Sequence, residues 1–161
     1  MMNQRSRRIP NGSRWVEIRS SFHPHDMNGT GGGFILRDAN GRPLLAEAFP
    51  TNGFNALHAE ALALRQTMEV MIEIGEENVV FCHGSPVLQQ RMAPGAQIPS
   101  GRVGQVLLEC FALQEGRTMP EITYWPRENL AAASWLAECG RRCQQRCRWT
   151  GPWPPELEAL F

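Results

Sequence analysis

The stretch between residues 141 and 153 combines arginine with tryptophan, two residue types that together can bind nucleic acid. The set consists of Arg141, Arg142, Arg146, Arg148, Trp149 and Trp153. Arginine contacts phosphate and both types stack on bases, so the composition is typical of an RNA-binding surface. The same residues also anchor protein–protein contacts. A third interpretation is that Trp149 and Trp153 fold back over the hydrophobic core.

Cys139, Cys143 and Cys147 follow one another at intervals of four residues, which places them on one face of a helix. Three thiols suggest zinc, but structural zinc sites take four ligands and often contain closely spaced cysteine pairs. The same face continues Ala132 and Leu136. We therefore favour cysteines buried in apolar surroundings over a metal site.

Histidines at two further places could support chemistry. His23, His25 and Asp26 lie in a segment of turn residues without further ligands, so we interpret them as a solvated polar turn. His83 follows an apolar run and could act as an acid or base, but no nucleophile or orienting partner is evident beside it. We predict a structural histidine at this position and no metal site in the chain.

The composition is that of one globular domain. The chain has 161 residues, 42% of them hydrophobic, with a formal net charge of +0, so it can bury a core. Dedicated nucleic-acid binders are usually more basic, so any such surface must be local. All 16 Lys or Arg positions are arginine, and we favour codon bias over a functional reason as the explanation. Five cysteines, a polar start and no bilayer-length apolar run favour a reduced cytoplasmic or nuclear protein without a membrane partner.

Hydrophobic periodicity predicts the order of the elements. Apolar and polar residues alternate along residues 15–22, and the turn at 38–41 ends in Asn-Gly, a hairpin signal. An apolar stripe at helical spacing begins at Leu57, and Gly75 follows it as a cap. Residues 23–33 carry Pro, Asn and Gly and are predicted as a turn. The expected strands are 15–22, 34–37, 43–48, 78–82 and 122–125, and the expected helices are 55–74, 86–92, 103–113 and 127–146.

This order indicates an α/β fold with a mixed five-stranded sheet, in which three antiparallel strands precede parallel additions and helices flank the faces. We expect the domain to occupy residues 14–148. Residues 1–13 are polar and are predicted to be a flexible N-terminal segment. Residues 149–161, which contain tryptophan and three prolines, are predicted to be a C-terminal tail.

Three segments resemble the plant, retroelement-type branch of the ribonuclease H family. Residues 31–38, Gly-Gly-Gly-Phe-Ile-Leu-Arg-Asp, are similar to its glycine-rich second strand. Residues 56–65 are similar to its first helix, which carries a catalytic Glu. Residues 126–129 and 132–137 are similar to its last helix. The resemblance covers roughly residues 14–139 and implies the ribonuclease H fold, whose element order is the one predicted above.

The resemblance also implies a chemistry, because the family cuts RNA with four carboxylates around two Mg²⁺ ions. The matching positions in this chain are Arg19, Glu60, Gly84 and Ser134. Only Glu60 is an acid, and no Asp or Glu lies between residues 78 and 91 to replace the third carboxylate. We therefore expect no intact catalytic site and a lost Mg²⁺ site. Arg19 is expected to pair with Glu60, with a phosphate contact as the alternative.

The function predicted from the sequence is that of a catalytically inactive ribonuclease H-like domain that binds RNA or an RNA–DNA hybrid. The expected nucleic-acid contacts are Arg19, Arg141, Arg142, Arg146, Arg148 and Trp149. The alternative is a protein-interaction scaffold that binds no nucleic acid. A third hypothesis is residual cleavage by Glu60 with a single metal ion. It is less favoured because the family's chemistry uses two divalent ions, and one carboxylate cannot neutralise them.

Overall fold

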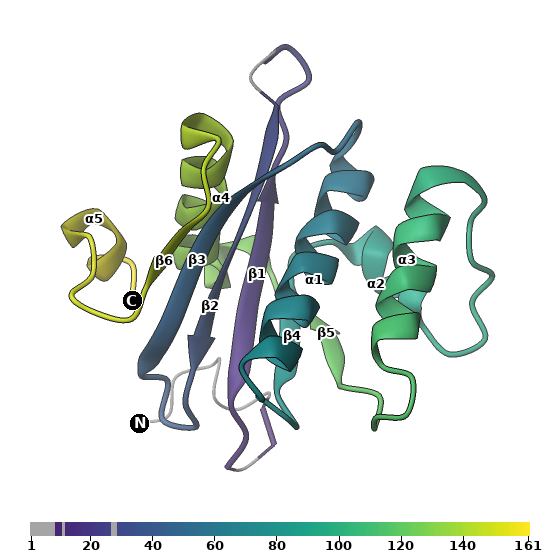
Figure 1. Ribbon diagram of the computed structural model, residues 1–161, viewed down its shortest axis with the longest axis horizontal. Helices are drawn as coiled ribbons and strands as arrows, with labels where there is room; N and C mark the ends of the chain where they lie inside the picture. The colour runs from purple at the N-terminus through teal and green to yellow at the C-terminus, as the bar shows by residue number, and fades with distance from the viewer. Residues whose placement is uncertain (1–8, 11, 27–28) are drawn as a thin grey trace.

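A six-stranded mixed sheet forms the centre of the computed structural model, which describes residues 9–10, 12–26 and 29–161 (Figure 1). Its order is β5-β4-β1-β2-β3-β6. The strands are β1 (Trp15–Ser21), β2 (Thr30–Arg37), β3 (Pro43–Thr51), β4 (Val80–His83), β5 (Ile122–Tyr124) and β6 (Cys147–Trp149). β1, β2 and β3 are antiparallel, whereas β4 lies parallel to β1 and β5 parallel to β4. The predicted fold class is confirmed, with one strand more than expected.

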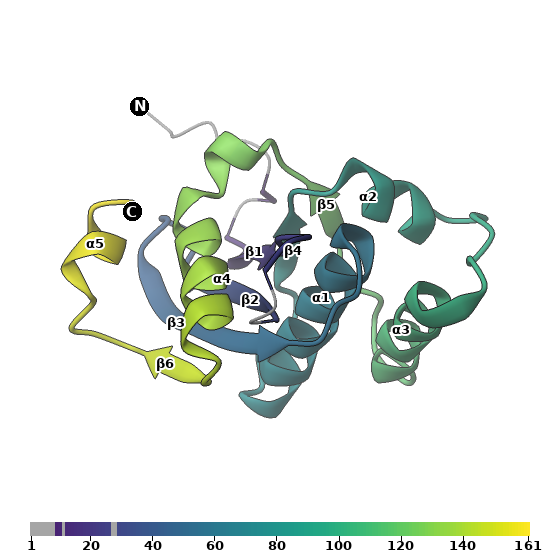
Figure 2. The same cartoon turned by 90° about the horizontal axis from the view of Figure 1, so that it is seen from above.

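Helices cover both faces of this sheet. They are α1 (Ala56–Glu73), α2 (Pro86–Met92), α3 (Gly101–Leu113), the 3-10 turn η2 (Arg127–Asn129), α4 (Ala131–Cys143) and α5 (Pro155–Glu158). Seen from above, α4 lies on one side of the sheet and α1 and α3 on the other (Figure 2). The alternation of β1 contributes to this arrangement, because Val16 and Ile18 join the core with α1 and α3, while Ser21, on the other face, donates a hydrogen bond to Glu138 on α4. None of the helices in the described residues is long and apolar enough to cross a bilayer.

Side chains cap the helices that follow the sheet. The Asn55 side chain accepts a hydrogen bond from the backbone N–H of His58 (2.8 Å), which starts α1. Ser85 accepts from the backbone N–H of Leu88 (3.1 Å) in the same way and starts α2 directly after β4. Gly75 adopts a φ of 77° just beyond α1, as predicted from its position. These caps fix where each helix leaves the end of its strand.

Glycines let α4 lie directly on the backbone of β2 and β3. A Cβ on Gly33 would meet the Leu136 Cβ at 2.5 Å, and one on Gly31 would meet the Arg141 backbone N at 2.2 Å. On the opposing helix, a Cβ on Gly140 would meet the Phe49 carbonyl oxygen at 2.4 Å. The prediction of a turn over residues 23–33 was therefore wrong at its end, because Gly31 and Gly33 belong to strand β2. Glycine is needed there because the backbone of α4 occupies the space of a side chain.

The last helix is shorter than the predicted 127–146. It ends at Cys143, and Gln144 takes a left-handed conformation with φ 50°. The chain then turns back, and β6 pairs antiparallel with β3 as the sixth strand. The prediction that the helix extends to Arg146 was wrong. Apolar spacing alone could not reveal this end, because a partner on β3, Glu47, holds the returning chain.

The C-terminal residues pack against the sheet–α4 core. Leu157 is completely buried and joins the cluster that contains Ile35 and Leu136. Trp149 and Trp153 pack against the same cluster, which confirms the interpretation that they fold back over the core. At the other end of the chain, Ile9 is buried although it falls within the segment predicted to be flexible; residues 1–8 and 11 lie outside the described residues.

Candidate functional site

Three of the four positions matched to catalytic acids meet where β1 and β4 separate. The parallel pairing of these strands ends at Ile18 and His83. Arg19 and Gly84 follow immediately, and Glu60 reaches the same point from the first turns of α1. Parallel strands that end together beside a helix place side chains from three segments at one edge of the sheet. The structure therefore brings three of the four sequence-predicted positions together.

The cluster is built around an ion pair between Arg19 and Glu60. Arg19 Nη1 lies 3.5 Å from Glu60 Oε1, and the two side chains are 13% and 4% exposed. The Ser20 hydroxyl donates a hydrogen bond to the other Glu60 oxygen, Oε2. Arg19 Nε and Glu60 Oε1 have no hydrogen-bond partner among the described residues. The expected pairing is therefore present, but it is a single charge contact and lacks the expected bidentate geometry.

The guanidinium of Arg19 also explains why residue 84 is small. A Cβ built on Gly84 would lie 2.6 Å from Arg19 Nη1 and 3.2 Å from Leu130 Cδ1. Real Cβ atoms do not approach polar nitrogens so closely, so any side chain at this position would displace the arginine. Arg19 thus fills the space in which a side chain at position 84 would begin.

Ser134, the fourth position, lies on α4 and is half-buried. Its backbone N–H donates to the carbonyl of Leu130 (2.9 Å), one turn earlier in the chain. Leu130 in turn borders Gly84, so the start of α4 flanks the ion pair. Three of the four positions carry a neutral or cationic residue, and the cluster as a whole holds one cation and one carboxylate.

His83 is completely buried at the end of β4 and is held by hydrogen bonds. Its Nε2 lies 2.8 Å from Gln89 Oε1, and its Nδ1 accepts from the backbone N–H of Ser85 (3.2 Å). Because a carbonyl oxygen only accepts, these partners assign the neutral tautomer with the proton on Nε2. Burial lowers the pKa of His83, and the nearby Arg19 acts in the same direction, against the Gln89 hydrogen bond and Glu60. The contacts are those of a structural histidine.

The structure places Arg141 inside the protein and not on a binding face. Its side chain is 8% exposed and forms ion pairs with Asp26 and Glu138. Its Nε also donates to the Ser21 hydroxyl (3.1 Å), and that hydroxyl donates to Glu138 (2.7 Å). Burial tends to raise the pKa of Glu138, but hydrogen bonds from Ser21 and His23 and the charges nearby hold it below its usual value. Arg141 therefore joins α4 to the β1–β2 connection.

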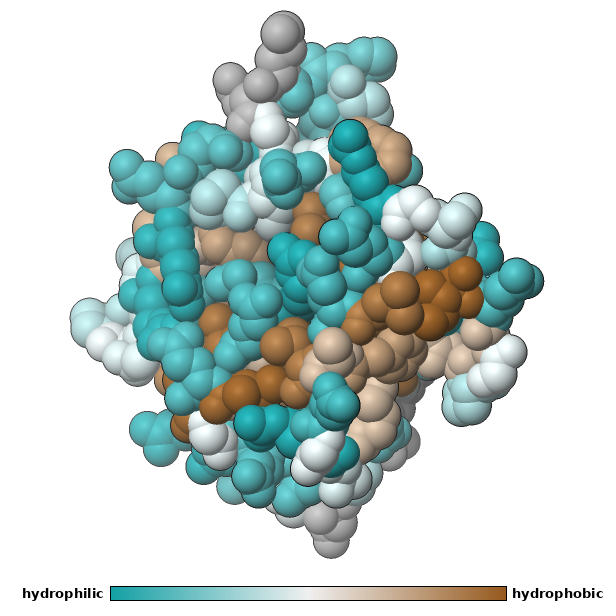
Figure 3. Space-filling view, turned by 45° about the vertical axis from the view of Figure 1, so that its right-hand side comes forward, coloured by the Kyte–Doolittle hydropathy of each residue, from teal (hydrophilic) through white to brown (hydrophobic). Residues whose placement is uncertain are grey.

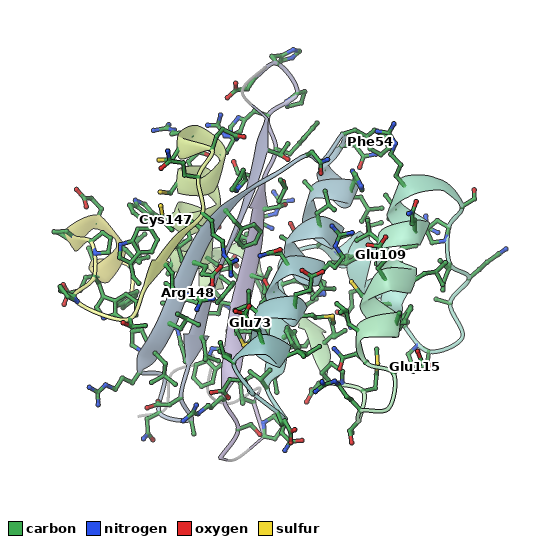
Figure 4. All side chains as sticks on the ribbon, viewed as in Figure 1. Phe54, Glu73, Glu109, Glu115, Cys147 and Arg148 are labelled. Carbon is green, nitrogen blue, oxygen red and sulfur yellow. The ribbon has the colours of Figure 1, made fainter. Side chains whose placement is uncertain are left out.

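Glu47 forms ion pairs with two more of the arginines that were predicted to contact nucleic acid. This carboxylate on β3 is fully buried and accepts from Arg146 Nε (2.9 Å) and Arg148 Nε (2.7 Å). Arg142 is 72% exposed and pairs with Glu138 at 3.0 Å. Figure 4 labels Cys147 and Arg148 on β6, the edge strand beside β3. The predicted arginine surface is thus largely engaged in ion pairs within the protein.

The cysteines also differ from the expectation of a buried apolar face. Cys143 is exposed, and Cys139 and Cys147 are half-buried. Cys147 belongs to β6, so it does not share a helix face with the other two. Within the described residues, no three His, Cys, Asp or Glu side chains converge closely enough to hold a metal ion. His23 lies 3.4 Å from Glu138, and Asp26 is paired with Arg141.

Other exposed cations, which the sequence did not single out, lie at the end of the sheet where β4 and β5 finish. Arg102, at the start of α3, stacks over the ring of Phe54, 5.2 Å from its centroid. Phe54 precedes α1, is 52% exposed and stands at the top of Figure 4. Arg127 is exposed in η2, which follows β5. Only the folded topology brings α1, α3 and η2 to one end, so sequence spacing gives no signal for this set.

A cavity of about 660 Å³ lies at the opposite end of the molecule. Met71, Val79 and Phe81 contribute its apolar part, and Glu76 and Glu121 contribute carboxylates. The four positions matched to catalytic acids do not line it. Its acidic rim would repel phosphate, so this cavity is separate from the candidate nucleic-acid site.

Comparison with known proteins gives a family and a fold. A family model described as "Reverse transcriptase-like" matches residues 17–140. The structure is similar to ribonuclease H1 from the archaeon Halobacterium salinarum, with a TM-score of 0.72 and 16% identity, covering 82% of this chain and 99% of that one. It is also similar to LC11 ribonuclease H1, isolated from compost and solved with an RNA/DNA hybrid, with a TM-score of 0.73 and 15% identity over 81% and 98% of the two chains. No curated protein sequence matched. The resemblance to the ribonuclease H superfamily is confirmed.

The Arg19–Glu60 pair should stabilise the fold through mutual neutralisation. We expect Arg19→Met to lower the free energy of unfolding by about 3 kcal/mol, because it leaves a buried carboxylate without its cation. Glu60→Gln should cost a similar amount, and the double variant should cost clearly less than the sum. Urea unfolding of the four proteins measures the coupling. Additive costs would show that the two charges do not interact.

The buried neutral His83 should make stability depend on pH. Its folded pKa lies below the ordinary value of 6.5, so the unfolded chain binds the proton first as pH falls. The stabilisation is complete above pH 6.5 and is lost as pH falls toward the folded pKa. Between about pH 7.5 and about pH 5.5 we expect a loss of up to about 1 kcal/mol that His83→Gln removes. His25→Gln, in the exposed turn, is the matched control, and an unchanged pH profile in the His83 variant would contradict the assignment.

Proposed function

The chain belongs to the reverse transcriptase-like family of ribonuclease H-fold domains, and we propose that it is a member that no longer cuts RNA and instead binds RNA or an RNA–DNA hybrid. The observation that carries the proposal is the Arg19–Glu60 ion pair at the position where the resemblance expects metal ions. The similarity extends to foamy virus protease–reverse transcriptase, with a TM-score of 0.63 and 12% identity over 84% and 99% of the two chains. This likeness supports a retroelement origin.

The residues at the four positions do not fit two Mg²⁺ ions. Two such ions bring four positive charges and are held by clustered carboxylate oxygens. Glu60 supplies one carboxylate, while Arg19 adds a permanent positive charge whose Nη1 lies 3.5 Å from it. Gly84 has no side chain, and Ser134 offers a neutral hydroxyl. Charge and space both favour the ion pair over metal, which supports loss of cleavage.

Binding can persist without the metals, because a hybrid duplex is recognised by its shape, its backbone and its 2′-hydroxyls. LC11 ribonuclease H1, which was solved with an RNA/DNA hybrid, shares this fold across nearly its whole length. We call the end of the sheet where β4 and β5 finish the site end. There, the exposed Arg102 and Arg127 offer cations, and Phe54, over which Arg102 stacks, offers a stacking ring. Arg19 is 13% exposed and already paired, so a phosphate contact there would compete with Glu60.

One observation favours the alternative of a protein-interaction scaffold. Turning the α3 side forward shows a band of hydrophobic residues among hydrophilic ones (Figure 3). Leu108 on α3 is 55% exposed, Met119 in the following loop 46%, and Ile74 at the end of α1 38%. Large exposed apolar side chains of this kind are found at protein contacts. We place this second because the arrangement around Arg19 preserves the position of the ancestral site.

The proposal predicts no metal-dependent cleavage of an RNA–DNA hybrid by the natural protein, with Mg²⁺ or with Mn²⁺. The variant that combines Arg19→Asp, Gly84→Asp and Ser134→Asp should gain such activity, because all four matching positions would then carry the carboxylates that the resemblance implies. Adding Glu60→Gln to this variant is the matched control and should remove the gain. Cleavage by the natural protein that disappears in Glu60→Gln would overturn the proposal.

Binding should depend on salt and on the arginines of the site end. We expect Arg102→Ala and Arg127→Ala each to weaken binding of a labelled RNA–DNA hybrid and to reduce the slope of log affinity against log salt by about one. Arg117→Ala is the matched control, because Arg117 is exposed in the loop between α3 and β5 at the opposite end. Duplex DNA should bind less tightly than RNA-containing ligands. No binding at low salt, or equal effects of all three variants, would favour the protein scaffold.

A further inference from the structure

Two thiols touch at the end of α4. Cys139 Sγ lies 3.9 Å from Cys143 Sγ, one helical turn further along. Cys143 is exposed to solvent, and Cys139 is half-buried against the cluster that contains Leu136 and Leu157. Cys82 and Cys110, by contrast, are buried in the core. The ion pairs and the candidate binding residues described above use neither thiol of the pair.

The geometry of the pair is close to that of a disulfide. Residues four apart on a helix have Cβ atoms about 5–6 Å apart, whereas a disulfide needs about 3.5–4.5 Å. The last turn must therefore close by about 1 Å. Cys143 is the final residue of α4, and Gln144 already leaves helical geometry with φ 50°. Because helix ends are the parts of a helix that adjust most easily, this turn can close without moving the rest of α4.

The two thiols differ in their readiness to react. Burial, the contact with Cys143, and the charges that Cys143 and Cys147 would carry raise the pKa of Cys139 to about 11. Cys139 therefore stays protonated in the resting protein. Cys143 is the accessible thiol, so it is the one that meets a dissolved disulfide first.

We infer that Cys139 and Cys143 form a dithiol site that low-molecular-weight disulfides, such as oxidised glutathione, convert to a protein disulfide. The Cys143 thiolate attacks one glutathione sulfur, the glutathione disulfide bond breaks, and one glutathione thiolate leaves. Cys139 then loses its proton to solvent and attacks the Cys143 sulfur, which releases the second glutathione. In sum, two protein thiols are oxidised and one glutathione disulfide is reduced to two thiols.

The sequence around the pair allows a direct test. The chain contains no lysine, so trypsin cuts it only after arginine. Arg141 and Arg142 lie between the two cysteines, and Arg146 separates Cys143 from Cys147. The peptides 128–141 and 143–146 therefore separate when the thiols are reduced. When Cys139 and Cys143 are joined, the two peptides stay linked and lack two hydrogen atoms.

The experiment incubates the folded protein with oxidised glutathione, blocks remaining thiols, digests with trypsin and measures the linked peptide by mass spectrometry. We expect the linked peptide to become the main form of residues 143–146 in the natural protein and in Cys147→Ser. In Cys139→Ser the expected product is a glutathione adduct on Cys143, because the second step is blocked. Circular dichroism verifies that each variant is folded.

Two results would overturn the inference. One is that, in the natural protein, Cys143 carries only glutathione or stays reduced in the presence of excess oxidised glutathione. The other is a linkage of either cysteine to Cys147 in place of the Cys139–Cys143 link. Neither result bears on nucleic-acid binding, which is tested separately by the salt titrations.

Discussion

Buried carboxylates must be neutralised where they stand, and much of this structure is arranged to do so. Glu17, Glu47 and Glu60 are almost completely buried and lie on β1, β3 and α1. Removing the partner of a buried charge costs about 3–5 kcal/mol, so each needs a cation that the fold itself supplies. Arg37 pairs with Glu17 at 2.7 Å, Arg19 with Glu60, and both Arg146 and Arg148 with Glu47.

This demand for local neutrality changes what the arginine content means. Arginine is the only basic residue in the chain, so it serves both the interior and the surface. Its planar group can satisfy a carboxylate from a fixed direction, and it remains charged when partly buried. A cluster of arginines in the sequence, such as that between residues 141 and 148, therefore describes ion pairs as readily as it describes a nucleic-acid surface. The exposed cations of the site end are dispersed in sequence and would not be found by clustering.

Features that depend on neighbours within the chain were predictable. The alternation in β1, the apolar stripe of α1 and the Asn-Gly turn each arise from local geometry, and all three elements are present. The position of Arg19, Glu60 and Gly84 at one point was also predicted, because the resemblance carried the topology with it. Given that position, the pairing of Arg19 with Glu60 followed from their opposite charges.

Features that depend on a distant partner were missed. β6 exists because β3 offers a free edge and Glu47 binds the returning arginines, and neither is visible in a window around residue 147. The glycines at 31–33 look like a turn until α4 is placed on them. Cys143 was expected to be buried because it continues the helix face of Ala132 and Leu136, but it is the last residue of α4 and is exposed. Each error came from extending a local pattern across a point where tertiary contact ends it.

Arg19 and Gly84 depend on each other. With Arg19 in place, the space beside position 84 is filled, and a side chain there would collide with the guanidinium at 2.6 Å from its Cβ. With a carboxylate at position 84 instead, Arg19 would have two acids to neutralise and would block the space between them. An acid at position 84 alone would displace Arg19, and an acid at position 19 alone would leave its charge unbalanced beside Glu60. Under the proposed loss of cleavage, regaining a metal site would therefore need changes at both positions together.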